Sequence, residues 1–207
     1  MNNSEYQIEL NRIYGQIDCE HLKYWRIDYT DSSETIGIYS ISLDSSLSIE
    51  EYNNLEEHDS IKKYINTVPI RNNIIYIGET SDSIKKRLYQ DELGGCYLNG
   101  KQKKSHHATF YRKLGSVLGF KSINPTDKIL KESQRRNFVF NLADNEKIRN
   151  WIQRHLRIKY FKIKGTFISD IQNALILNFH PTFNGTHNPK KCETISLLIK
   201  RNRERDR

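Results

Sequence analysis

The chain has 207 residues, of which 36 % are hydrophobic and 11 % aromatic. That is enough for one domain with a core and some appended helices. No apolar run is long enough to cross a bilayer and no signal peptide is recognisable, so we expect a cytoplasmic protein without a membrane anchor. Three widely spaced cysteines argue against a disulfide framework. The net charge of +8 favours a polyanionic partner, and nucleic acid is the commonest one.

The first half of the chain predicts one helical region and two strands. Residues 1–33 form a polar extension that we expect to be helical. Alternating residues over 35–43 predict a strand, and the apolar run 73–77 predicts a second one. The segment 44–72 between them is polar and charged, and a short helix is expected at 60–65.

The second half of the chain predicts helices that alternate with strands. Apolar spacing and capping residues place four helices, which begin at Ser81 or Asp82, at Ala108, at Asp144 or Asn145, and at Ile168. Strands are expected at 137–142 and 158–163, and a short last helix at 195–199. This order predicts an α+β fold with a small, mainly antiparallel sheet flanked by helices.

Two tripeptides, Gly37-Ile38-Tyr39 and Tyr76-Ile77-Gly78, lie in the first two predicted strands, and a helix carrying Arg87 follows the second. A later helix and loop carry, in this order, Gln172, Leu175, Ile176, Pro181 and Asn184. Together these residues resemble the motifs of the GIY-YIG nuclease superfamily. Residues 105–118 and 184–189 further resemble a subgroup of small stand-alone bacterial members. The family typically has a short hairpin between the two motif strands, so the resemblance implies that the segment between them is an insertion, as in restriction-type members. The resemblance covers residues 34–189 and implies that domain, with residues 190–207 left as a basic C-terminal helix and tail.

The resemblance implies hydrolysis of phosphodiester bonds, a reaction that needs an activated water and stabilisation of developing charge. Tyr39 matches the family's general base or water-orienting group. Because a free tyrosine has a pKa of about 10, a cation such as Arg87 has to lower it. Tyr76 matches a supporting tyrosine, and Arg87 matches the group that contacts the scissile phosphate. Taken singly, each tyrosine would be read as an ordinary strand residue; the combined order favours the active site.

Gln172 stands where the family has a glutamate that binds Mg²⁺ or Mn²⁺. A glutamine offers only an uncharged oxygen, so the resemblance implies that metal binding is weak or absent and that cleavage is weakened or lost. Either a catalytic glutamate has been replaced so that substrate is held without being cut, or the chain is a natural non-cleaving member. The other, intact motif positions favour the first explanation. Compensation by Glu79 or Asp170 is disfavoured, because neither occupies the matching position.

The candidate nucleic-acid contacts are Lys103, Lys104, Arg112, Asn184 and His187. The three basic residues flank the predicted site in sequence and suit phosphate contacts, although a solvated charge cluster explains them equally well. In the family, the loop that holds Asn184 and His187 lies near the active site. A structural hydrogen bond is the alternative role for Asn184.

The leading hypothesis is a metal-dependent endonuclease that acts on duplex DNA in restriction, phage defence, mobile elements or repair. The alternatives are a nucleic-acid-binding module that does not cleave, and an effector that cuts RNA. With one active site per chain, cutting both strands would require a homodimer or sequential nicking.

Overall fold

The computed structural model describes most of the chain, in separate stretches. These are residues 3–17, 36–44, 73–81, 83–84, 86–94, 97–98, 101–102, 108–123, 138–163 and 166–204. The chain divides into two units. The first unit comprises Met1–Ser45, Ile70–Arg87 and His155–Lys191, and the second comprises Ser46–Pro69, Leu88–Arg154 and Cys192–Arg207. The expected domain boundaries after residues 33 and 189 stay predictions.

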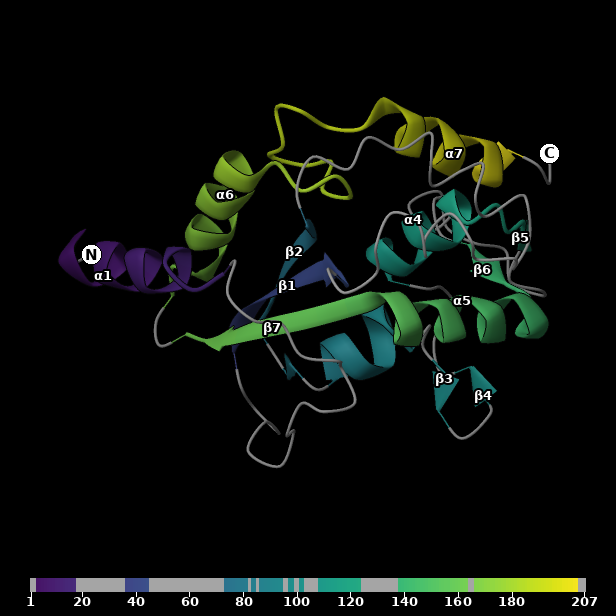
Figure 1. Ribbon diagram of the computed structural model, residues 1–207, viewed down its shortest axis with the longest axis horizontal. Helices are drawn as coiled ribbons and strands as arrows, with labels where there is room; N and C mark the ends of the chain where they lie inside the picture. The colour runs from purple at the N-terminus through teal and green to yellow at the C-terminus, as the bar shows by residue number, and fades with distance from the viewer. Residues whose placement is uncertain are drawn as a thin grey trace. The chain divides into compact units, whose positions relative to one another are not determined.

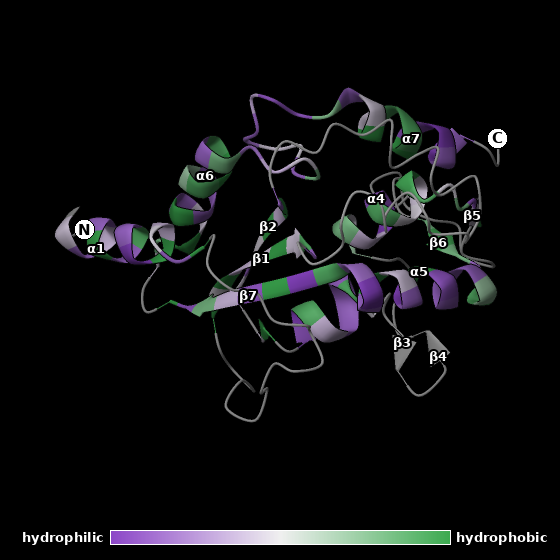
Figure 2. Ribbon diagram, viewed as in Figure 1, coloured by the Kyte–Doolittle hydropathy of each residue, from purple (hydrophilic) through white to green (hydrophobic). Residues whose placement is uncertain are grey.

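The first unit is built on a three-stranded antiparallel sheet (Figure 1). Its strands are β1 (Gly37–Leu43), β2 (Ile74–Thr80) and β7 (Leu156–Lys162), in the order β2-β1-β7. The central strand β1 is buried along nearly its whole length. By contrast, β7 alternates apolar and polar residues from Leu156 to Tyr160, as Figure 2 shows, and then buries Phe161 on its other face. The predicted antiparallel sheet of an α+β domain is confirmed.

One face of this sheet packs against two helices, α1 (Asn3–Tyr14) and α6 (Ile168–Phe179). The core between them contains apolar residues from all three strands and both helices: Ile13, Ile17, Ile38, Ile77, Phe161, Ile171 and Leu175. Tyr14 of α1 also contacts Phe179 of α6, with ring centroids 5.3 Å apart. The helix predicted from Ile168 ends before Pro181, as expected, through His180 in the left-handed conformation.

The described residues of the second unit form three α-helices and two short pairs of antiparallel strands. The helices are α4 (Thr109–Val117), α5 (Leu142–His155, whose last residue lies in the first unit) and α7 (Glu193–Glu204). In the strand pairs, β3 (Tyr97–Leu98) lies beside β4 (Lys101–Gln102), and β5 (Ser122–Ile123) lies beside β6 (Val139–Phe140). Polar bonds tie the helices together: the Tyr111 hydroxyl donates to the Asn145 carbonyl at 3.1 Å, and the Asn202 amide donates to the Ser116 hydroxyl at 2.7 Å.

Two of the predicted helices differ in detail from what was expected. The helix after β2 is a π-helix, η2 (Lys86–Glu92), and Ser83 rather than Ser81 or Asp82 precedes it as the capping residue, accepting from the Lys86 N–H at 3.2 Å. Helix α5 begins at Leu142, because the Asn141 side chain accepts from the Asp144 N–H at 2.8 Å.

The strand expected at 137–142 shrinks to the two residues of β6 and pairs with β5 rather than with the main sheet. The helix expected at 60–65 lies outside the described residues. Within the described parts of the chain, no helix combines the length and the apolar character needed to traverse a lipid bilayer.

Candidate active site

The two motif strands hold Tyr39 directly opposite Gly78. The register of β1 on β2 pairs these residues, and the Tyr39 ring lies on the glycine. A Cβ atom added to Gly78 would lie 2.3 Å from both Cζ and the hydroxyl oxygen of Tyr39. Glycine is therefore the only residue that leaves room for this ring position. The Tyr39 side chain is fully buried.

Arg87 reaches the same tyrosine from the start of η2. Its Nε donates to the Tyr39 hydroxyl oxygen at 3.3 Å. The backbone holds Arg87 in place, because its N–H donates to the Ser83 carbonyl at 2.8 Å. The neighbouring apolar residues Ile84 and Leu88 are both fully buried, so the π-helix is anchored on either side of the arginine. A guanidinium charge thus lies at the phenol oxygen.

Tyr76 is the second tyrosine of this cluster. It lies on the same face of the sheet as Tyr39, with ring centroids 6.3 Å apart and an interplanar angle of 43°. A tilted pair of this kind is a favourable aromatic arrangement. Tyr76 is 8 % exposed, so it is slightly more accessible than its neighbour. The structure therefore brings together Tyr39, Tyr76 and Arg87.

Gly37 begins the first motif for a steric reason as well. A Cβ atom there would lie 2.3 Å from the Phe161 carbonyl oxygen and 2.6 Å from Cδ1 of Ile84. Gly37 thus allows β7 and the segment before η2 to approach β1 closely. Both motif glycines are explained by packing around the tyrosine cluster.

Gln172 and Asn184 lie at the free edge of β2 and share one backbone carbonyl. Nε2 of Gln172 donates to the Ile77 carbonyl at 3.3 Å, and Nδ2 of Asn184 donates to the same oxygen at 2.8 Å. The Ile77 N–H in turn donates to Oδ1 of Asn184 at 2.9 Å. Because Ile77 stands between Tyr76 and Gly78, these two amides fix the backbone of the second motif.

The loop after α6 continues this edge pairing. The Phe183 N–H donates to the Ile75 carbonyl at 2.8 Å. Nδ2 of Asn188 closes the loop by donating to the carbonyls of Pro181, at 2.8 Å, and Asn184, at 3.1 Å. Asn184 is buried and has the structural hydrogen bonds that were one of its two expected roles.

The residues around Gln172 do not fit a divalent cation held as the family resemblance implies. The Gln172 amide nitrogen is bound to the Ile77 carbonyl, and its oxygen carries no charge. Glu79 is a nearby carboxylate of β2: its Oε1 accepts from the Ser169 hydroxyl at 2.9 Å, and its Oε2 is buried without a hydrogen-bond partner. Within the described residues, no group of three or more His, Cys, Asp or Glu side chains is placed to hold a metal ion.

The remaining predicted contacts are Lys103, Lys104, Arg112 and His187. Lys103 and Lys104 lie outside the described residues. Arg112 belongs to the second unit, where its guanidinium lies over the Phe138 ring at 5.7 Å and donates to the Thr109 hydroxyl at 3.4 Å. His187 is exposed, with a left-handed φ of 58°, in the loop that follows Asn184.

Sequence reasoning missed the supporting residues Ser83 and Asn188. Ser83 caps the helix that carries Arg87, and Asn188 ties the loop that carries Asn184. A serine three residues before the start of a helical pattern is a recognisable capping signal, so Ser83 could have been found. Asn188 had no such signal, because its partners are backbone carbonyls that only the folded loop brings close.

The comparisons with known proteins agree with this geometry. The family model of the GIY-YIG catalytic domain matches residues 37–204, well over half of the chain. No curated protein and no solved structure gives a significant match. The matched region begins at Gly37 and includes the buried contact between Tyr39 and Arg87. It also includes Gln172 and Asn184, which bind the edge strand β2. The chain therefore belongs to the GIY-YIG nuclease family.

Proposed function

We propose that this protein is a GIY-YIG endonuclease that acts on DNA and whose cleavage is weakened by Gln172. Membership of the family implies a phosphodiester hydrolase with a nucleic-acid substrate. The observation that carries the proposal is the hydrogen bond from Arg87 to the hydroxyl of the buried Tyr39, whose ring lies on Gly78 at a position that a larger residue would block.

This contact supplies two of the elements that phosphodiester hydrolysis needs. The Tyr39 oxygen accepts from Arg87, so the positive charge favours the phenolate that would take a proton from the attacking water. The guanidinium carries several coplanar N–H groups, a geometry that matches phosphate oxygens. Arg87 would thus orient Tyr39 and neutralise charge on the phosphate in the transition state.

The third element, help for the leaving oxygen, is deficient here. GIY-YIG nucleases generally depend on a divalent metal ion, which supplies charge stabilisation when bound. Gln172 provides no charged ligand, and its amide is engaged with the backbone of β2. We therefore expect Mg²⁺ or Mn²⁺ to bind weakly or not at all in this chain.

A second candidate function follows from the same residue. With Tyr39, Tyr76 and Arg87 in place and Gln172 uncharged, the chain would bind nucleic acid without cutting it. A binding module of this kind and a slowed nuclease share the same substrate surface, and they differ only in what a carboxylate at position 172 restores.

The Gln172→Glu substitution tests the proposal. The original chain and the variant are incubated with supercoiled duplex DNA and with single-stranded RNA, each in Mg²⁺ and in EDTA. We expect Mg²⁺-dependent DNA cleavage by the variant at least about 100-fold faster than by the original chain, because a lost metal contact costs several kcal/mol of barrier.

Two outcomes would count against the proposal. If the folded variant still binds DNA but cuts neither substrate, the non-cleaving module is favoured. If only RNA is cut, the assignment to DNA is wrong and the RNA-cutting effector replaces it.

A further inference from the structure

The third strand of the sheet carries two side chains beside Tyr39. In the antiparallel register of β7 on β1, Tyr160 lies opposite Tyr39, and Lys162 lies opposite Gly37. Residues paired across two strands point to the same face of the sheet. Tyr160 and Lys162 therefore lie on the face that carries the tyrosines and Arg87, on the side of β1 opposite to β2.

These two residues differ from the catalytic tyrosine in their exposure. Tyr39 is fully buried, whereas Tyr160 is half-buried and Lys162 is exposed. A substrate that reaches the Tyr39 hydroxyl has to lie over neighbouring groups that remain accessible. On β7, Tyr160 and Lys162 are the accessible residues of this face.

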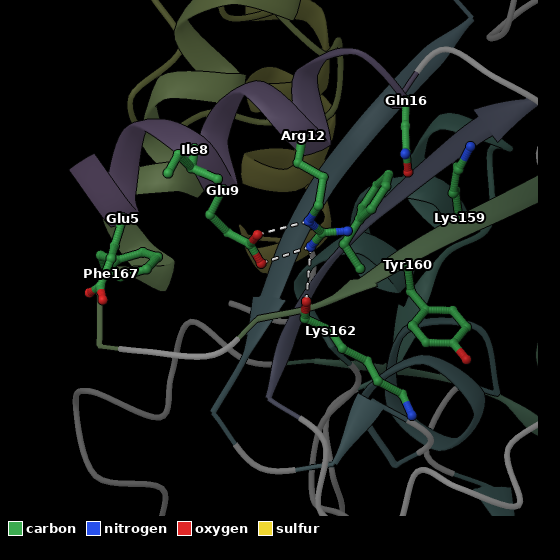
Figure 3. Close-up of a pocket in the computed structure, with 10 residues that line it drawn as sticks. Glu5, Ile8, Glu9, Arg12, Gln16, Lys159, Tyr160, Lys162 and Phe167 are labelled. Carbon is green, nitrogen blue, oxygen red and sulfur yellow. Dashed lines mark hydrogen bonds and ion pairs between the residues drawn. The ribbon is translucent and has the colours of Figure 1, made fainter. Parts of the chain in front are cut away.

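The side of β7 that faces α1 offers a comparison. A groove of about 770 Å³ runs along this strand and α1, and Figure 3 shows its lining, which includes Tyr160 and Lys162. In that view Tyr160 and Lys162 extend away from α1. Lys159 lies on the other face, with its ammonium 5.8 Å from the centre of the Phe161 ring.

The wall formed by α1 is unsuited to a polyanion. Two of its lining residues, Glu5 and Glu9, are acidic. Arg12 is engaged there, since it donates to both carboxylate oxygens of Glu9 and to the Lys162 carbonyl at 3.1 Å. A DNA strand is therefore favoured on the Tyr160–Lys162 side of β7 and disfavoured on the α1 side.

We propose that Tyr160 and Lys162 bind the DNA backbone and sugar–base unit next to the phosphate that Arg87 contacts. This inference rests on the proposed function and adds that the substrate strand runs along β7, past Tyr160 and Lys162. Lys162 provides a compact positive charge for the neighbouring phosphate. Tyr160 provides an aromatic surface for a base or sugar.

The test is equilibrium binding of a short fluorescein-labelled DNA duplex to the full chain, titrated over about 50–300 mM NaCl. The variants are Lys162→Gln and its control Lys159→Gln, Tyr160→Ala and its conservative partner Tyr160→Phe, and Arg87→Gln. Thermal unfolding of each variant verifies that it is folded.

We expect Lys162→Gln to weaken binding roughly five- to tenfold near 0.1 M salt and to reduce the salt-dependence slope by about one, because one phosphate contact is lost. Lys159→Gln should leave that slope unchanged. Tyr160→Ala should weaken binding about fivefold or more. Tyr160→Phe should lose much less affinity, because it keeps the aromatic ring. A merely structural role for Lys162 would not change the salt slope.

The outcomes separate this inference from the proposed function. Suppose that the chain binds DNA and that Arg87→Gln weakens binding, but that Lys162→Gln behaves like Lys159→Gln. The proposed path of DNA along β7 is then wrong, and the proposed function stands. If the original chain does not bind DNA even at the lowest salt, the proposed function fails and this inference fails with it.

Discussion

Gly78 and Tyr39 act as a pair, although they stand 39 positions apart in the sequence. The glycine lies under the ring of the tyrosine, and the ring position places its hydroxyl within reach of Arg87. At the scale of single residues, the site thus depends on the space left by Gly78 as much as on its polar groups.

Gly78→Ala should displace the Tyr39 ring, because the new methyl group would overlap it. We expect a loss of about 1–3 kcal/mol in the free energy of unfolding, as in other overpacked cores. Urea unfolding measures this loss. Gly15→Ala is the matched control, since a Cβ there meets only the Asn11 carbonyl oxygen at 3.5 Å. Equal stability of the two variants would contradict the packing described.

Lys113 in α4 gives the second unit a pH-dependent stability. Burial lowers the pKa of Lys113 to about 8, partly offset by the negative charge of Glu92. An unfolded lysine titrates near 10.5, so the unfolded chain holds the proton between these values when the folded chain does not. Stability should therefore rise with pH in this window.

Comparison of the original chain with Lys113→Met isolates this effect. Between about pH 7.5 and 9.5, the free energy of unfolding of the original chain should increase by about 1–2 kcal/mol relative to the variant. Urea unfolding at the two pH values measures it. A difference that stays constant or shrinks would show that the Lys113 pKa is not lowered.

At the scale of elements, the edge strand β2 is completed by the loop after α6. The Asn184 side chain satisfies both the N–H and the carbonyl of Ile77, as a neighbouring strand would. Exposed strand edges invite unwanted pairing, and the loop covers this one. The Pro–x–x–Asn part of the family pattern thus holds the second motif in position.

Asn184→Ala would leave two buried backbone groups of Ile77 without the side-chain partner they share. We expect a loss of about 1–3 kcal/mol in the free energy of unfolding. Asn178→Ala, at an exposed position on α6, is the control and should change stability by less than about 0.5 kcal/mol. If both variants unfold at the same denaturant concentration, the edge pairing is not stabilising.

The sequence predicted well what depends on local spacing. Helix α6 was expected to begin at Ile168 and to stop before Pro181, and it does, because apolar periodicity and proline act within a few residues. The pairing of β6 with β5 could not be predicted, because which strands pair depends on how distant segments pack in the folded chain. The π-helical form of η2 has no signal in residue spacing either.

In the candidate site, too, some features were predictable from the sequence and others were not. Motif order predicted that Tyr39, Tyr76 and Arg87 would meet. It could not show that the Gln172 amide binds the Ile77 carbonyl, nor that Arg112 lies in the other unit, because both depend on how distant segments pack.

At the scale of the whole molecule, the tyrosine cluster found among the described residues belongs to a chain with a net charge of +8. Such a charge favours rapid, salt-sensitive association with DNA. Under the proposed function, one such site would attack one strand at a time, so cutting both strands of a duplex would require successive events or two chains together.

Plasmid cleavage by Gln172→Glu should distinguish these routes. For a chain that acts alone, supercoiled plasmid should pass through a nicked circle before linear DNA forms, at a rate proportional to protein concentration. Agarose electrophoresis over time measures this course. Linear product that forms without a nicked intermediate, with a rate rising as the square of protein concentration, would indicate a homodimer instead.

Tyr39, held by Arg87 over Gly78, is the proposed cleaving centre. The most direct measurement is the single-turnover rate of Mg²⁺-dependent DNA cleavage by Gln172→Glu and by the double variant Gln172→Glu/Tyr39→Phe. Removing the hydroxyl of a general base should slow cleavage by about 100-fold or more, while DNA affinity stays within about twofold. Equal cleavage rates for the two variants would contradict the account.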